Sequence, residues 1–276
     1  MKTVALGLRT VPVLGQGTWN MGDSTGKRSA EIATLRRGIE LALTLIDTAE
    51  MYGSGRSESL VGEAIKGLRD RVQLVSKVLP SNASAEGTMR ACDASLKRLG
   101  VEALDLYLLH WRGRFSLGET VAGFERLLKQ GKIGAWGVSN FDVDDMEELF
   151  RVPGGEGCTV NQVLYNPEHR GIEFDLVPWC KSHGVTVMAY SPVGQGGKLL
   201  ASAALRKVAR KHGVSPAQVA LAWCLRGPIL GIPKASSVAH VEENAAATDL
   251  VLDREDLAEI DRVFPAPKRK QGLDML

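Results

Sequence analysis

The sequence predicts a (β/α)8 barrel, the TIM-barrel architecture, because short apolar runs alternate with longer segments of helical periodicity along the chain. Several of the short runs are continuously apolar, which is typical of strands buried on both faces of a parallel sheet. With 276 residues, of which 44% are hydrophobic, the chain is long enough for one large core. We therefore expect a single barrel domain over residues 1–276.

Eight strand and helix units cover residues 13–233. Strands are expected at the short apolar runs, residues 13–17, 45–47, 72–77, 104–109, 133–139, 159–162, 186–190 and 229–233. Helices are expected where apolar residues recur three and four positions apart, at residues 29–43, 57–68, 88–99, 117–130, 142–150, 175–183, 201–212 and 216–226. Regular alternation of this kind predicts a parallel sheet that closes into a barrel.

Segments at both ends of the chain lie outside these units. Residues 2–10, with Gly7 at a turn, predict a small N-terminal β-hairpin before the first barrel strand. After the eighth strand, residues 240–248 and 253–263 predict extra C-terminal helices, the second with Asp253 as its N-cap. Pro265 and Pro267 end helical structure there, because proline has no backbone N–H to donate.

Composition and charge exclude several classes of function. A formal net charge of +2 indicates no nucleic-acid partner. No apolar run approaches the roughly 20 residues of a membrane span, and the N-terminus lacks a secretory signal, so we expect no membrane association and a cytoplasmic protein. The four cysteines are too scattered for a metal site or a disulfide framework. A monomer is expected, with oligomers left open.

Four polar residues stand at or just after the ends of predicted strands: Asp47, Tyr52, Lys77 and His110. Taken singly, each has an ordinary structural explanation, such as a helix cap, a solvated strand end or a buried imidazole. In a parallel barrel, however, neighbouring strands place their last residues around one pocket at the carboxyl-terminal face. One shared site is therefore the simplest explanation of all four positions.

These residue types suit proton donation to a carbonyl oxygen. An ammonium at Lys77 stabilises the phenolate of Tyr52 and lowers its pKa toward the working range, while Asp47 keeps the lysine charged. His110 can donate a hydrogen bond to the substrate carbonyl. Because the set supplies no hydride, a reductase needs a cofactor. A Schiff-base aldolase with Lys77 as nucleophile is an alternative that fits the same residues.

Further motifs resemble the aldo-keto reductases over nearly the whole chain. They are LIDTAEMYG at 45–53, LVSKV at 74–78, LLHW at 108–111, GAWGVSNF at 134–141, NQVLYN at 161–166, AYSP at 189–192 and IPKA at 232–235. The resemblance implies that Asp47, Tyr52, Lys77 and His110 form the catalytic tetrad, with Tyr52 as general acid. The short C-terminus and the ending at residues 265–268 are most similar to bacterial methylglyoxal reductase-type members.

The same resemblance implies NADPH as the cofactor, with NADH as a weaker alternative. It assigns Ser139, Asn140 and Gln162 to the nicotinamide carboxamide and Tyr190 to stacking on the ring. The other implied contacts follow the first, seventh and eighth strands: Gly17, Thr18, Trp19, Ser191, Pro192, Val193, Gly194, Gln195, Lys234, Ala235, Ser236, Ser237, His240, Glu243 and Asn244. No GxGxxG fingerprint follows a strand, which disfavours a Rossmann dehydrogenase.

His240 departs from the family's pattern. Many members carry an arginine there, and a neutral imidazole binds phosphate less strongly than a bidentate guanidinium does. Lys234 is then the main cation for the adenosine 2′-phosphate. We expect a preference for NADPH that is weaker than usual and that depends on pH, since imidazoles change charge between pH 5 and 8.

Two tryptophans beside strand ends, Trp19 and Trp111, are expected to wall the substrate pocket, as such aromatic residues do in the family. The connection at residues 112–116 and the polar tail after Pro265 are short, so they offer little sequence for a deep pocket. The expected substrates are small aldehydes and ketones, such as methylglyoxal. The other alternative is a non-catalytic protein of this fold that binds NADPH, against which the intact tetrad argues.

Overall fold

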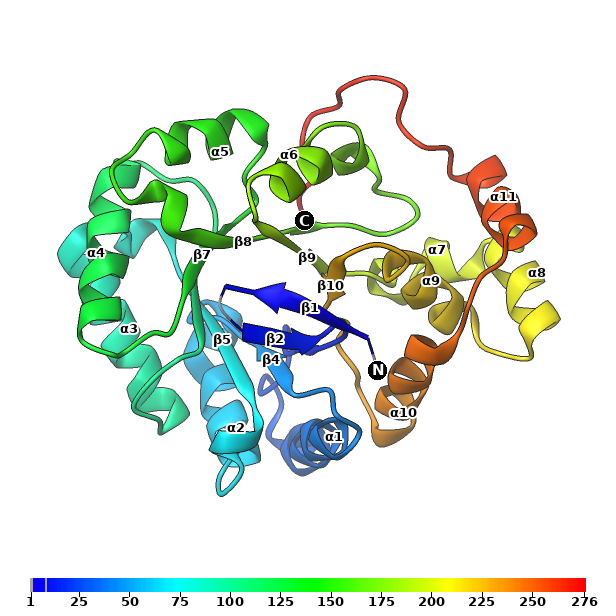
Figure 1. Cartoon of the computed structure of the whole chain (residues 1–276). Helices are drawn as coiled ribbons and strands as arrows, with labels where there is room; N and C mark the ends of the chain where they lie inside the picture. The colour runs from blue at the N-terminus through cyan, green and yellow to red at the C-terminus, as the bar shows by residue number, and fades with distance from the viewer. Residues whose placement is uncertain (1, 8) are drawn as a thin grey trace.

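The computed structural model describes residues 2–7 and 9–276, and it shows the barrel that the sequence predicts (Figure 1). Eight parallel strands follow one another around the sheet in chain order. They are β3 (Gln16–Gly17), β4 (Leu45–Asp47), β5 (Gln73–Val78), β6 (Leu106–Leu109), β7 (Trp136–Ser139), β8 (Cys158–Leu164), β9 (Thr186–Tyr190) and β10 (Ile229–Gly231).

The sheet closes between its first and last strands. Gly15 N donates to Gly231 O at 2.8 Å, and Gly231 N donates to Val13 O at 2.8 Å. Residues 13–15, which the sequence assigns to the first strand, therefore bond across the seam to β10, and β3 itself is only two residues long. Closure leaves no free edge, so the strands can carry one packed interior.

Helices surround the sheet on its outer side (Figure 1). They are α1 (Arg28–Glu40), α2 (Arg56–Ala64), α3 (Ala85–Leu99), α4 (Leu117–Lys129), α5 (Val143–Phe150), α6 (Leu176–Ser182), α7 (Lys198–Ala201), α8 (Ala203–His212), α9 (Pro216–Cys224), α10 (Val238–Ala246) and α11 (Arg254–Val263). None of the described helices is long and apolar enough to span a bilayer. The extra helices predicted after the eighth strand are present as α10 and α11.

Local capping explains where several helices differ from their predicted bounds. Ser84 accepts a hydrogen bond from Gly87 N at 3.1 Å, so α3 begins before the predicted residue 88. The helix predicted over residues 201–212 is α8, which begins at Ala203; Ser202, whose ψ of 135° is extended, separates it from the short helix α7 that ends at Ala201. Asp253 caps α11 as expected, with its side chain accepting from Asp256 N at 2.9 Å.

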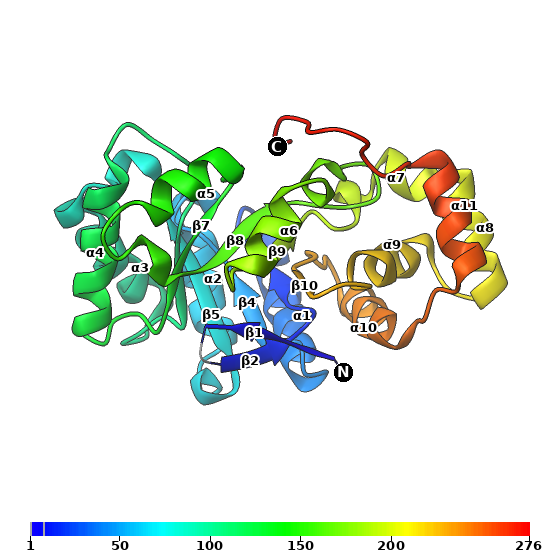
Figure 2. The same ribbon diagram turned by 45° about the horizontal axis from the view of Figure 1, so that its top comes forward.

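The predicted N-terminal hairpin consists of β1 (Thr3–Leu6) and β2 (Arg9–Pro12), which pair antiparallel. It covers the amino-terminal ends of the barrel strands, where Thr186 Oγ1 donates to Ala5 O at 2.7 Å. Its buried side chains belong to the same apolar cluster as the strand residues inside the barrel. Figure 2 shows the hairpin and the C-terminal tail at opposite ends of the barrel. The carboxyl-terminal end of the strands is thus the end left for a site.

Candidate active site

The structure brings Asp47, Tyr52, Lys77 and His110 together at the carboxyl-terminal ends of three neighbouring strands. Asp47 is the last residue of β4, Lys77 lies near the end of β5, and His110 directly follows β6. Tyr52 begins a short 3₁₀ turn after β4. Parallel pairing in register, with Leu45 opposite Gln73 and Val75 opposite Leu106, is what aligns these strand ends.

Lys77 is the centre of this group. Its Nζ contacts Asp47 Oδ2 at 2.7 Å, Thr48 O at 2.9 Å and Tyr52 Oη at 3.3 Å. The side chains of Lys77 and Asp47 are 0% and 2% exposed, so this is a buried ion pair. Burial by itself lowers the pKa of Lys77, but the charge of Asp47 and the oxygen of Tyr52 outweigh it and raise that pKa. Lys77 is therefore an ammonium with its three donors all engaged.

The Tyr52 phenol is half-buried beside this ammonium. Burial raises the pKa of Tyr52, and the opposing effect of Lys77 is the smaller of the two. The expectation that Lys77 would bring this pKa down to the working range is therefore not met in the protein alone. The consequence is a phenol that keeps its proton at neutral pH, which is the form that a general acid requires.

His110 packs edge-on against Tyr52, with 5.8 Å between the ring centroids, and lies 4.8 Å from the ring of Trp111. Burial, helped by the charge of Lys77, lowers the pKa of His110 to about 3. The imidazole is consequently neutral at physiological pH. Its Nδ1 is buried without a partner among the described residues. A neutral imidazole still carries one N–H that can donate to a ligand.

A cavity of about 730 Å³ opens above this group. Most residues that the sequence nominated line it: Gly17, Thr18, Trp19, Asp47, Tyr52, His110, Trp111, Ser139, Asn140, Gln162, Tyr190, Ser191, Pro192, Val193, Gln195, Lys234, Ser236, His240, Glu243 and Asn244. Lys77 is buried beneath it. The predicted contacts Gly194, Ala235 and Ser237 are not on this surface.

Each of these three has a structural reason for its placement. Ala235 is 6% exposed and packs with the apolar residues inside the barrel. Ser237 caps α10, accepting from His240 N at 3.3 Å. Gly194 has a φ of +59° and lies against the side chain of Leu199, so it shapes the turn after β9. As cofactor contacts, these three residues stay predictions.

One end of the cavity is suited to an anion. Lys234 is the one Lys or Arg among the described residues that line it, and its Nζ contacts Ser236 Oγ at 2.9 Å. His240 is exposed in the first turn of α10, where the helix dipole favours negative charge. This end of the cavity thus combines a lysine, a hydroxyl, an imidazole and a helix N-terminus. Such a set of groups suits a phosphate.

The side of the cavity nearest the tetrad is held by a hydrogen-bond network. Asn140 Nδ2 donates to His110 O at 3.1 Å, and Tyr190 Oη donates to Asn140 Oδ1 at 2.9 Å. Ser139 Oγ donates to Gln162 O at 2.8 Å. Gln162 Nε2 in turn donates to a carboxylate oxygen of Asp47 at 2.8 Å. The residues nominated for the carboxamide are thus bonded to one another and to the tetrad.

Backbone strain is concentrated around the same cavity. Four of its lining residues other than glycine have left-handed backbone: Asn20, Asn140, Ser191 and Gln195, with φ of 64°, 60°, 48° and 57°. Such conformations cost about 1–3 kcal/mol each and gather at functional sites. This strain is independent support for the cavity as the candidate site.

The C-terminal tail contributes more to the cavity wall than its sequence predicts. Met275 and Leu276 line the cavity. The tail is attached to the barrel by a contact of 2.9 Å between Asp274 Oδ2 and His169 Nδ1. Lys270 lies 3.5–3.6 Å from the carboxylates of Asp142, Asp144 and Asp175. The expectation that this tail adds little to the pocket is wrong. The sequence signal for this contribution is the pair of apolar residues, Met275 and Leu276, at the end of an otherwise polar tail.

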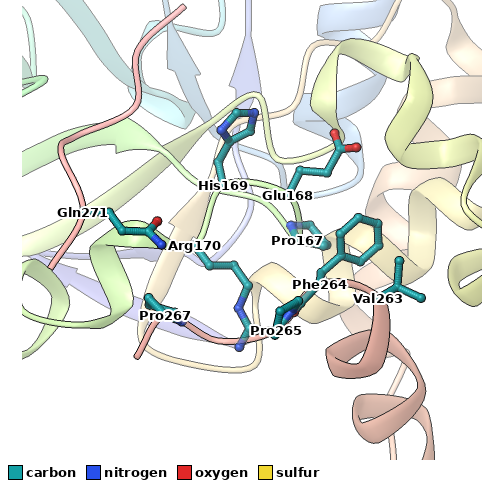
Figure 3. A pocket seen from close by; sticks show the side chains of 9 residues that line it. All are labelled: Pro167, Glu168, His169, Arg170, Val263, Phe264, Pro265, Pro267 and Gln271. Carbon is teal, nitrogen blue, oxygen red and sulfur yellow. The ribbon is translucent and has the colours of Figure 1, made fainter. Parts of the chain in front are cut away.

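A second cavity, of about 480 Å³, lies between the loop after β8 and the chain that follows α11 (Figure 3). Its walls include Pro167, His169 and Phe264 but none of the four tetrad residues. Arg170 in this wall is already paired with Glu173 at 2.8 Å and Asp261 at 2.7 Å. The described residues contain no cluster of His, Cys, Asp and Glu suited to a metal ion. The chemistry therefore concentrates in the first cavity.

Comparison with known proteins identifies the family of this chain. Residues 13–264 match the model of the "Aldo/keto reductase family". The chain belongs to the aldo/keto reductase family. This confirms the family resemblance, the fold and the assignment as an oxidoreductase.

Individual relatives narrow the resemblance within the family. The chain is 52% identical to "Methylglyoxal reductase YeaE" of Escherichia coli over 97% of this chain and 96% of that protein. It is 36% identical to the glyoxal reductase of Bacillus subtilis, over 93% and 92% of the two chains. An aldo/keto reductase of Klebsiella pneumoniae, solved with NADP and acetate, has 51% identity, a TM-score of 0.98 and coverage of 100% and 99%. The predicted likeness to bacterial methylglyoxal reductases is confirmed.

Proposed function

We propose that this protein reduces small aldehydes and ketones, including α-oxoaldehydes such as methylglyoxal, to alcohols with NADPH. The observation that carries the proposal is the buried Asp47–Lys77 pair, which contacts the Tyr52 phenol at the base of a large cavity. The family, the methylglyoxal and glyoxal reductases among its relatives, and the NADP complex of the Klebsiella protein support it.

The chemistry of the cavity walls fits NADPH. Lys234, Ser236 and His240 suit a phosphate at one end, and Asn140 and Gln162 offer amide groups near the tetrad. Tyr190 is half-buried and presents an aromatic ring to the same cavity. When bound, NADPH supplies the hydride that no side chain can supply.

The protein's own groups then handle the proton. Tyr52 donates its phenolic proton to the carbonyl oxygen, and Lys77 stabilises the phenolate that remains. Asp47 holds the ammonium in place, and neutral His110 donates a hydrogen bond that orients the substrate oxygen. With the pKa of Tyr52 raised and that of His110 near about 3, both groups keep these proton states between pH 6 and 8.

The cavity walls favour small, neutral substrates. Trp19, Met51, Trp111, Met275 and Leu276 all line the cavity, and Trp111 lies beside His110. Apolar walls of this kind bind a short carbonyl compound without charged partners. The test is NADPH oxidation measured across a panel of short aldehydes, ketones and ketoacids. Turnover of short α-oxoaldehydes is the expected result, and a panel with no turnover at all would exclude the proposal.

The Schiff-base alternative is disfavoured by the environment of Lys77. An aldolase lysine must present a neutral, accessible amine, whereas this side chain is wholly buried with its three donors engaged. Borohydride treatment with a carbonyl substrate should therefore leave no lysine adduct. A stable adduct on Lys77 would support the aldolase instead.

Replacing His240 with arginine is expected to tighten NADPH binding by roughly tenfold, because a guanidinium donates two hydrogen bonds to a phosphate. Kd values for NADPH and NADH, from quenching of tryptophan fluorescence, measure this. NADH binding should not change, and an equal gain for both cofactors would show that position 240 does not contact the 2′-phosphate.

A further inference from the structure

Gln162 is placed where it contacts the tetrad directly. It lies on β8, is 2% exposed and lines the cavity. Its Nε2 donates to Asp47 Oδ1 at 2.8 Å, while the other oxygen of that carboxylate, Oδ2, accepts from Lys77 at 2.7 Å. Asp47 thus bridges Gln162 and Lys77, and Lys77 contacts Tyr52 Oη. One unbroken chain of hydrogen bonds runs from Gln162 to the phenol.

The surroundings determine which way the Gln162 amide faces. A carboxylate can only accept, so the group presented to Asp47 must be the NH₂. The second contact of Nε2 is Met188 Sδ at 2.9 Å, and a thioether sulfur is also an acceptor. Both amide hydrogens are therefore used within the protein. No described residue donates to Oε1, which leaves this oxygen as the free acceptor of a residue that lines the cavity.

Within the proposed function, Gln162 Oε1 accepts from the carboxamide of the cofactor. We propose that Gln162 is in addition a positioning residue for the proton donor, because the hydrogen bond from its NH₂ holds Asp47. This rests on the proposed function and adds to it a physical link between cofactor binding and the acid. When Oε1 is engaged, the amide is fixed at both ends, and Asp47, Lys77 and Tyr52 are held in one arrangement. Asp47 is the charged group bonded to Gln162, and Lys77 stands one bond further on.

Two substitutions separate this role from simple cofactor binding. Gln162→Met keeps the length of the side chain but removes both the donor and the acceptor. Gln162→Glu keeps an acceptor oxygen at every pH, but it can donate to Asp47 only while it is protonated. The neighbouring carboxylate of Asp47 favours that protonated form, because two adjacent carboxylates resist ionising together. In the glutamate variant, the hydrogen bond to Asp47 therefore forms at low pH and is lost at high pH.

We expect Gln162→Met to lower kcat at saturating NADPH by roughly tenfold to a hundredfold, the effect of one hydrogen bond to a charged group. Gln162→Glu should retain most of its kcat at pH 5 and approach the methionine variant by pH 8. Its Kd for NADPH should stay within roughly threefold of the wild-type value at pH 8, because the carboxylate still accepts from an amide.

Gln73→Glu is the matched control. Gln73 begins β5 at the opposite end of the barrel, and its Oε1 accepts from Thr44 Oγ1 at 2.7 Å, a bond that glutamate can keep. Its kcat should follow the wild-type pH profile.

The measurements are kcat from pH 5 to 8 with the substrate that wild type turns over best, and Kd for NADPH by fluorescence quenching at the same pH values. A fall in kcat of Gln162→Glu with rising pH, at unchanged Kd, supports the proposal. A flat kcat profile, or a kcat that simply follows Kd, overturns it. Failure of wild type to oxidise NADPH with any carbonyl would instead count against the proposed function, so the two failures are distinguishable.

Discussion

Replacing Tyr52 with phenylalanine is expected to lower kcat for NADPH-dependent carbonyl reduction by roughly a hundredfold to ten-thousandfold, the range that a positioned general acid contributes. The substitution removes only the hydroxyl that contacts Lys77 Nζ at 3.3 Å. The ring that packs on His110, with centroids 5.8 Å apart, is retained. Stopped-flow or steady-state NADPH absorbance measures the loss, and Kd for NADPH should be unchanged.

Tyr107→Phe is the control for this substitution. Tyr107 is fully buried in β6, and its hydroxyl has no hydrogen-bond partner among the described residues. Losing that hydroxyl should leave kcat at the wild-type value. If Tyr52→Phe were as active as Tyr107→Phe, Tyr52 would not be the proton donor.

Replacing Lys77 with methionine is expected to abolish most activity and also to destabilise the protein by about 3–5 kcal/mol, the cost of leaving a buried charge without its partner. The reason is that Asp47, 2% exposed, would lose the ammonium 2.7 Å away. Equilibrium unfolding in urea measures the free energy, and NADPH oxidation measures the activity.

The double variant Lys77→Met, Asp47→Asn separates stability from catalysis. It removes both charges, so most of the lost stability should return, while activity should stay low because nothing stabilises the Tyr52 phenolate. Recovery of both together would mean that Lys77 contributes only to folding. Recovery of neither would mean that the ion pair is not the source of the destabilisation.

Short-range patterns in the chain were sufficient for the architecture. The strand at Leu45–Asp47 agrees with its predicted bounds, because a run of large aliphatic residues followed by a polar one marks the end of a buried strand. Placing Asp47, Lys77 and His110 at strand ends then required only the rule that parallel strands end on one face. The convergence of the four residues could therefore be anticipated without coordinates.

Errors arose where a contact joins residues far apart in the chain. Met275 reaches the cavity because Asp274 is held by His169, more than one hundred residues earlier in the chain. Periodicity reports which face of an element is buried, and it contains no information about such pairings.

The polar residues at the strand ends, and with them the chemistry of proton donation, follow from the order of residue types along the chain. The direction in which the pKa of Tyr52 shifts, and the orientation of the Gln162 amide, do not follow from that order. Both depend on how much water the folded barrel excludes and on which acceptors surround the group. Of these acceptors, Met188 is the partner of Gln162 on the neighbouring strand β9, whereas Asp47 lies on β4 and meets Gln162 only once the barrel has closed.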